Sequence, residues 1–141
     1  MRKIDELFDR YAQSHQDPRN KAIHWICVPL ITWSVVAFFW AWSPFAAYVF
    51  VALAIVFYLW LSPMIALGML AVSAVMIYPM LLLGRYVLVV AVTIFALAWI
   101  GQFIGHRIEG RKPSFFEDVK FLLVGPAWLL SFVYRHLHIP Y

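Results

Sequence analysis

Between Ala22 and His106 the chain runs for 85 residues with a single formal charge, at Arg85. So long an apolar block cannot be the core of a soluble domain of 141 residues, because it outnumbers the positions that such a domain can bury. Hydrophobic residues make up 65% of the chain and charged residues only 13%. We therefore expect one all-α membrane domain over residues 1–141, with the apolar block inside a bilayer.

Three breaks divide this block into segments that can each cross a bilayer as a helix. Two of them place a serine, which can cap a helix, before a proline, which suits the first helical position: Ser43-Pro44 and Ser62-Pro63. The third break is Gly84-Arg85. The segments 23–42, 44–61, 63–83 and 86–106 each come close to the roughly 20 residues that span a hydrocarbon core. We expect a bundle of four transmembrane helices over 23–106, joined by minimal turns.

Residues 1–20 predict an amphipathic helix and a turn at the membrane interface. Apolar side chains repeat at helical spacing at Ile4, Leu7, Phe8 and Tyr11, with charged residues between them. Continuing this period reaches His15, which would point toward the membrane domain. Asn20 can cap the first span.

The C-terminal part, 107–141, predicts further helices at the cytoplasmic interface. A capping box at Ser114–Glu117 opens one helix, and Gly125-Pro126 interrupts the apolar run 121–134. That run is too short to span a bilayer, and whether it lies on the interface or re-enters the membrane stays open.

The formal net charge of +4 comes from basic residues that flank the apolar block at both ends. This placement predicts cytoplasmic termini and contact with anionic membrane lipid, and it does not form the basic face that nucleic acid requires. A bacterial inner membrane and the endoplasmic reticulum fit equally well, and the pattern leaves open whether the chain forms a homo-oligomer.

Ionisable residues at the edges of the apolar block are the candidates for chemistry, because they are costly to keep near hydrocarbon. His24 and His106 stand at the two ends, and an even number of spans brings them to similar depth. Successive spacings of three, four and three residues place four side chains on one helix face: those of Trp99, Gln102, His106 and Glu109. With His15, these imidazole and carboxylate groups would suit divalent iron, whereas the lone Cys27 argues against a structural zinc site.

Other interpretations of the same residues remain open. The histidines can anchor the interface, in a small transporter or scaffold, and His24 with His106 can serve as axial ligands of a haem. Glu109 can pair with Arg107 or Arg111 instead of binding a metal.

Two segments resemble a known family. One holds His15, Asn20, His24 and Pro29, and the other runs Trp99-Ile-Gly-Gln-Phe-Ile-Gly-His-Arg-Ile-Glu-Gly-Arg-Lys-Pro113, with a looser match at Gly125-Pro-Ala-Trp128. They are similar to the small membrane proteins of the 2-hydroxy-fatty-acid dioxygenase family, named for a member that acts in phytosphingosine breakdown. Cys27 departs from the family pattern, where glycine is expected.

The resemblance implies an Fe(II)-dependent dioxygenase that uses molecular oxygen to shorten a 2-hydroxy fatty acid by one carbon. It implies that His15, His24 and His106 are catalytic metal ligands, and it leaves Glu109 as the least certain ligand. For the substrate we expect Arg107 and Arg111 to attract the carboxylate, although the same cations also suit lipid phosphates. Gln102, Asn20 and Trp99 complete the predicted substrate site.

Overall fold

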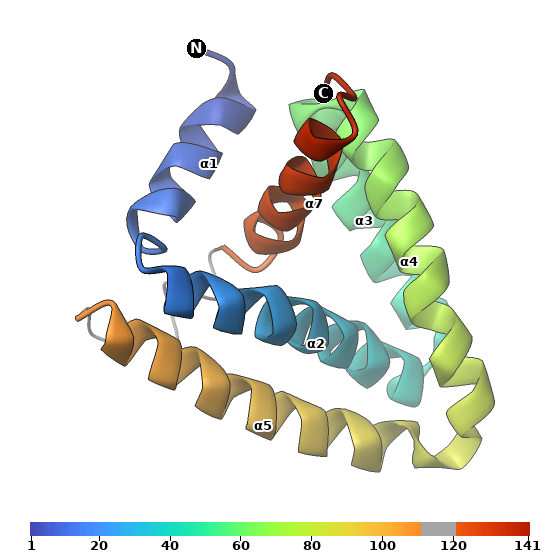
Figure 1. Cartoon of the computed structure of the whole chain (residues 1–141). Helices are drawn as coiled ribbons and strands as arrows, with labels where there is room; N and C mark the ends of the chain where they lie inside the picture. Colours follow the sequence, from blue (N-terminus) through green and yellow to red (C-terminus); the bar gives the residue numbers. More distant parts are fainter. Residues whose placement is uncertain (111–120) are drawn as a thin grey trace.

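The structure, a computed structural model, describes residues 1–110 and 121–141, and all regular structure in these residues is helical (Figure 1). This confirms the all-α class. The elements in chain order are α1 (Lys3–Gln13), α2 (Pro18–Trp42), α3 (Pro44–Leu61), α4 (Pro63–Leu83), a single 3₁₀ turn η1 (Gly84–Tyr86), α5 (Val87–Ile108) and α7 (Val124–His136).

The two Ser-Pro breaks begin and end helices as the sequence predicts. Ser43 and Ser62 have extended backbones, with φ of −162° and −166°, and each is followed by a proline in the first turn of the next helix. The Ser62 hydroxyl accepts a hydrogen bond from the Ile65 amide at 3.3 Å. The predicted bounds 44–61 and 63–83 are therefore confirmed.

The prediction of four separate transmembrane helices is wrong in the number of helical segments. Three helical segments are long and apolar enough to cross a membrane: Pro18–Trp42, Pro44–Leu61 and Pro63–Ile108. The last segment is continuous because Gly84, with a φ of +53°, turns the chain through η1 without leaving helical structure. The orientation of the chain, which the sequence predicts from the basic residues at both ends of the apolar block, stays a prediction.

The first of these segments starts earlier than predicted, and Asn20 is not its cap. Helix α2 begins at Pro18, and the Asp17 carboxylate caps it by accepting a hydrogen bond from the Arg19 amide at 2.8 Å. Asn20 lies inside the first turn, where its side chain is fully buried.

Helices α2 and α5 lie side by side and antiparallel, with small residues at their contact (Figure 1). A Cβ atom at Gly101 would come within 2.5 Å of the Cys27 sulfur, and one at Gly105 would overlap the Asn20 amide. Between helices in lipid, where apolar burial drives little association, such close backbone approach is a main source of stability. This pairing holds the start of α2 against the end of α5.

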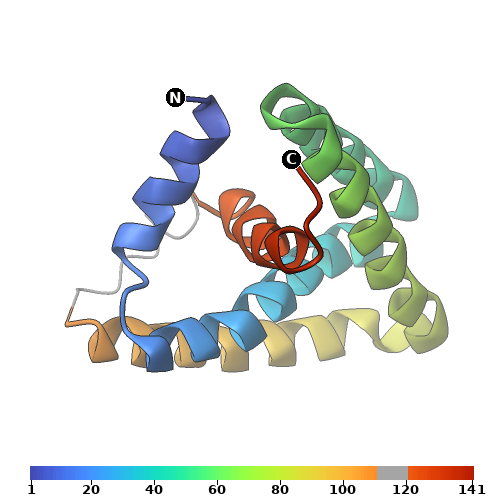
Figure 2. The same cartoon turned by 45° about the horizontal axis from the view of Figure 1, so that its top comes forward.

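The hairpin of α3 and α4 is attached to the other helices by hydrogen bonds to backbone carbonyls. The Tyr58 hydroxyl donates to the Leu123 carbonyl at 2.7 Å, and the Tyr134 hydroxyl donates to the Met64 carbonyl at 2.7 Å. Both bonds connect the hairpin to α7 or to the residue before it, and α7 lies between α1 and the hairpin (Figure 2).

The apolar stripe of α1 is covered by protein. Ile4, Phe8 and Tyr11 are buried in a cluster with residues of α7, including Trp128. The sequence could not separate this outcome from a membrane surface, because lipid and a partner helix demand the same amphipathic face.

Helix α7 also differs from its prediction. Gly125-Pro126 does not interrupt it but lies in its first turn, where proline is tolerated. The predicted capping box at Ser114–Glu117 lies outside the described residues.

Candidate functional site

Three histidines from separate parts of the fold meet beside the contact of α2 and α5. His15 follows α1, His24 lies in α2, and His106 lies in the last turn of α5. Their exposed fractions are 3%, 1% and 6%. The ring centroids are 4.2 Å apart for His15 and His24, 5.2 Å for His24 and His106, and 5.9 Å for His15 and His106. The expected convergence of the three rings is therefore present.

Backbone carbonyls fix two of these rings. The Nδ1 atom of His15 lies 2.6 Å from the Tyr11 carbonyl, and that of His24 lies 2.9 Å from the Asn20 carbonyl. Because a carbonyl oxygen only accepts, each Nδ1 carries the donated hydrogen, and in a neutral ring this leaves Nε2 with its lone pair. The same arrangement orients histidines that bind metals through Nε2.

The ring separations suit one shared metal ion. A metal–nitrogen bond of about 2.1 Å puts a ring centroid about 3.2 Å from the ion, so two ligand rings are about 4.5 Å apart at a right angle and about 5.2 Å at a tetrahedral angle. The observed values of 4.2, 5.2 and 5.9 Å bracket these separations. The buried Nε2 atom of His24 has no hydrogen-bond partner among the described residues, as expected for a nitrogen reserved for a ligand.

The side chains are not arranged for a metal ion as they stand. Within 1–110 and 121–141, no group of three or more His, Cys, Asp or Glu side chains could hold one. Closing a metal site therefore requires the side chains around the three rings to adjust.

Asn20 holds the turn between α1 and α2 against α5. Its Nδ2 donates to the Ser14 carbonyl at 3.1 Å, and its amide fills the space left by the missing side chain of Gly105. Ser14 directly precedes His15, so Asn20 fixes the turn that carries His15. The contacts of Asn20 position the turn that carries His15, and the predicted substrate contact of Asn20 stays a prediction.

Glu109 lies at the same turn. Its Oε1 accepts a hydrogen bond from the Asp17 amide, so the carboxylate connects the end of α5 to the start of α2. The described residues form no ion pair between Glu109 and Arg107. A role of Glu109 as a metal ligand stays a prediction.

The remaining predicted substrate residues are dispersed. Trp99 and Gln102 are buried and line a small cavity beside Tyr11 and Thr32. Within the part of the chain that the structure describes, the Oε1 atom of Gln102 has no hydrogen-bond partner. Arg107 is exposed at the end of α5, and Arg111 lies outside the described residues.

A pocket that opens onto His15 was missed from the sequence. We call it the head pocket; it has an open volume of about 750 Å³, lies between α1, the start of α2 and α7, and is lined by residues that include His15, Lys21, Trp128, Phe132, Arg135 and Tyr141. From the sequence, Arg135 counts only among the basic residues that follow the apolar block. The helical spacing of Trp128, Phe132 and Arg135 is the signal that could have placed it on one face of α7.

Comparison with known proteins agrees with the resemblance of the two segments. Searches of curated proteins and of solved structures gave no match. The match to a family covers residues 1–137 and so includes all three histidines and α7. The chain belongs to the family described as 2-hydroxy-palmitic acid dioxygenase Mpo1-like.

Proposed function

We propose that this protein is a membrane-embedded, iron-dependent dioxygenase that shortens 2-hydroxy fatty acids by one carbon, with His15, His24 and His106 as the iron ligands. The family description names the activity and a 2-hydroxy fatty acid. The observation that carries the proposal is the meeting of three buried imidazoles, two of them with Nδ1 held by a backbone carbonyl.

The spacing of the rings favours a single iron ion over a haem. Two histidines on opposite faces of a haem iron would have centroids about 6.4 Å apart, with the porphyrin plane between them. His24 and His106 are 5.2 Å apart, and His15 lies 4.2 Å from His24. Three imidazoles on one side of an ion leave other coordination positions open.

Iron bound here would supply a Lewis acid that chelates the carboxylate and hydroxyl of the substrate and a centre that activates oxygen. The residues of the chain hold and orient the imidazoles and keep water away from them. Tyr11 stacks on the His15 ring at 4.2 Å, and Trp128 lies 5.5 Å from the same ring. These aromatic side chains pack against the His15 ring, and Trp128 also lines the head pocket that opens onto His15.

The overall reaction balances with oxygen as the only oxidant. A 2-hydroxy acid and one molecule of oxygen yield the acid one carbon shorter, carbon dioxide and water. The hydroxyl-bearing carbon gives up three electrons and the carboxyl carbon gives up one, and oxygen accepts all four. The bond between these two carbons breaks, and no further reductant is required.

The test is metal analysis and oxygen consumption with detergent-purified protein. We expect bound non-haem iron, no Soret band, and oxygen uptake with 2-hydroxyhexadecanoic acid in a one-to-one ratio. Single changes of His15, His24 or His106 to alanine should remove iron and activity together. His136→Ala is the matched control, because His136 is an exposed histidine at the end of α7.

Two results would contradict the proposal. One is full turnover by protein stripped of metal. The other is unchanged iron content and activity in all three histidine variants, which would favour a scaffold or transporter in which the histidines only anchor the interface.

A further inference from the structure

The head pocket contains a positioned guanidinium. The Nε of Arg135 donates to the Ser131 carbonyl at 3.3 Å, and one terminal nitrogen donates to the Ser131 hydroxyl at 3.3 Å. Its Cζ atom lies 4.4 Å from the centre of the Phe132 ring. These contacts fix the side chain on α7 while leaving several of its five N–H donors for another group.

No carboxylate of the described chain uses these donors. The ion pairs in 1–110 and 121–141 join Arg2 to Asp5 and Arg19 to Asp17, and neither includes Arg135 or Lys21. Asp5 and Asp9 also line the pocket. Arg2 offsets the charge of Asp5, and its hydrogen bond holds the pKa of that carboxyl below the usual value. Asp9 is exposed to water, and its carboxylate lies in the same lining as the two cations, Lys21 and Arg135, that face an incoming anion.

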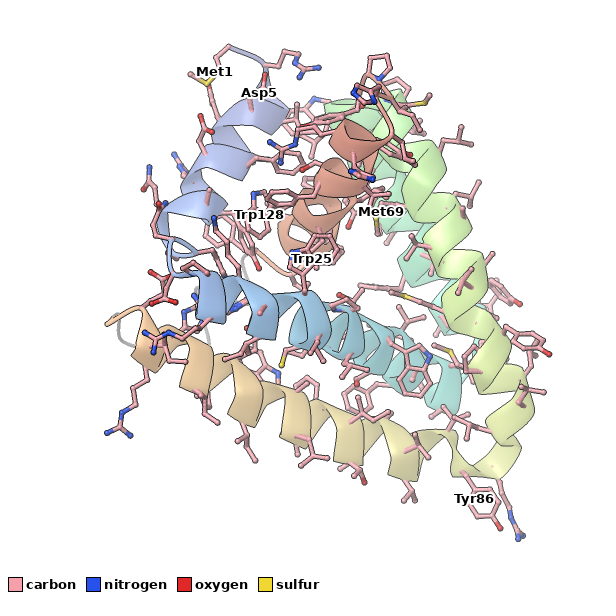
Figure 3. The ribbon with its side chains drawn as sticks, viewed as in Figure 1. Met1, Asp5, Trp25, Met69, Tyr86 and Trp128 are labelled. Carbon is pink, nitrogen blue, oxygen red and sulfur yellow. The ribbon has the colours of Figure 1, made fainter. Side chains whose placement is uncertain are left out.

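An apolar groove lies on the next face of α7. We call it the tail groove; it has an open volume of about 510 Å³ between α2, α4 and α7, and its lining, all apolar, includes Trp25, Met69, Val72, Met76, Leu129 and Val133. From Met69 to Met76 it follows α4 for about 10 Å. Figure 3 shows Trp25 and Met69 on this side of α7 and Trp128 on the side that faces α1.

The head pocket and the tail groove adjoin at one aromatic contact. Phe132 lines the pocket, Trp25 lines the groove, and their ring centroids are 5.9 Å apart. A molecule with an anionic head beside His15 and an apolar tail would pass this contact to reach the groove.

We propose that Arg135, assisted by Lys21, binds the carboxylate of the substrate, and that the tail groove receives its acyl chain past Trp25 and Phe132. This inference rests on the proposed function for the identity of the substrate. Arg135 then has the role that the sequence suggested for Arg107 and Arg111. It suits the role because a fixed guanidinium can form two parallel hydrogen bonds to one carboxylate.

Binding to metal-free protein tests the head pocket without requiring turnover. The probes are 2-hydroxyhexadecanoic acid and hexadecane-1,2-diol, which keeps the tail and the hydroxyl but lacks the carboxylate. We expect Arg135→Gln to weaken binding of the acid about tenfold, equivalent to about 1.4 kcal/mol, and to leave binding of the diol unchanged. Arg10→Gln, which removes an exposed arginine of α1, should change neither.

Three outcomes would overturn this assignment: no loss with Arg135→Gln, an equal loss for acid and diol, or Arg135-dependent binding of hexadecyl phosphate that is tighter than that of the acid. The last result would assign the pocket to lipid phosphate.

Arg135-dependent binding without any turnover would contradict the proposed function alone. Turnover that does not depend on Arg135 would contradict this inference alone.

A larger side chain that fills the tail groove tests whether the acyl chain of the substrate lies there. Val72→Trp should lower kcat/KM for the sixteen-carbon acid about tenfold or more relative to an eight-carbon 2-hydroxy acid. Val75→Trp is the matched control, because Val75 lies on the same helix with 73% of its surface exposed. If both variants kept the native chain-length preference, the acyl chain would lie elsewhere and the proposal would fail.

Discussion

The rings of His15 and His24 lie 4.2 Å apart with their planes at 83°, and each ring has its Nδ1 against the carbonyl of the residue four positions earlier. The two carbonyls belong to Tyr11 and Asn20. Because Asn20 also donates to the Ser14 carbonyl, one short stretch of chain orients both histidines. The turn between α1 and α2 is therefore part of the candidate site.

The first prediction concerns Asn20. Replacing it with alanine removes the hydrogen bond to Ser14 and leaves a gap against Gly105, at a fully buried position. We expect Asn20→Ala to lower the free energy of unfolding by about 1–3 kcal/mol and to reduce iron content. Thermal unfolding in detergent and metal analysis measure the two effects.

Gln13→Ala is the control for this change, because it removes an exposed amide from the end of α1. Asn20→Ala protein that loses stability but keeps its full iron content would show that Asn20 supports the fold without positioning His15.

The second prediction separates two roles of Glu109. The structure gives it the Asp17 amide as a partner, and a glutamine can accept the same hydrogen bond. We expect Glu109→Gln to keep iron and activity, and Glu109→Ala to lower the free energy of unfolding by about 1–3 kcal/mol, since it leaves the Asp17 amide without its acceptor. Loss of iron in Glu109→Gln at unchanged stability would identify the carboxylate as a metal ligand.

The third prediction tests the connection of α3 to α7. Tyr58 is 2% exposed, and its hydroxyl donates to the Leu123 carbonyl. Tyr58→Phe should lower the free energy of unfolding by about 1 kcal/mol, because it leaves a partly buried acceptor without its donor. Tyr48→Phe, at an exposed tyrosine of the same helix, should have no effect on thermal unfolding. Equal stability of both variants would mean that the bond contributes nothing.

Local signals in the sequence were sufficient for the helix bounds at the two Ser-Pro breaks and for the helix face on which His15 lies. Ser43-Pro44 and Ser62-Pro63 determine where helices stop and start through backbone geometry alone. The helical period that includes Tyr11 extends to His15, which predicts the face on which His15 lies. Both signals act within a few residues and therefore do not depend on the tertiary fold.

Local signals were insufficient where a distant partner decides the outcome. Gly84 allows a turn that can either separate two helices or continue one, and its neighbours in the chain do not choose between these outcomes. Glu109 has arginines beside it in the sequence, but its partner Asp17 is 92 positions away. Arg135 became relevant only once α7 was placed against α1 and the start of α2.

The fourth prediction uses Cys27, the position at which the family resemblance leads us to expect glycine. A Cβ at Gly101 would lie 2.5 Å from the Cys27 sulfur, which is closer than real Cβ contacts, so Gly101→Ala should push α2 away from α5. We expect this variant to lose about 1–3 kcal/mol of unfolding free energy and part of its iron, since His24 is carried on α2 one turn before Cys27.

Removing the sulfur should repair this damage. In the double variant Cys27→Ala with Gly101→Ala, the new methyl group occupies part of the space that the sulfur leaves, so the two effects should not add. The double-mutant cycle, measured by thermal unfolding and iron content, should give a coupling of about 1 kcal/mol or more in favour of the double variant. Strictly additive losses would mean that Cys27 and Gly101 do not determine the spacing of α2 and α5, and that the position of His24 depends on other contacts.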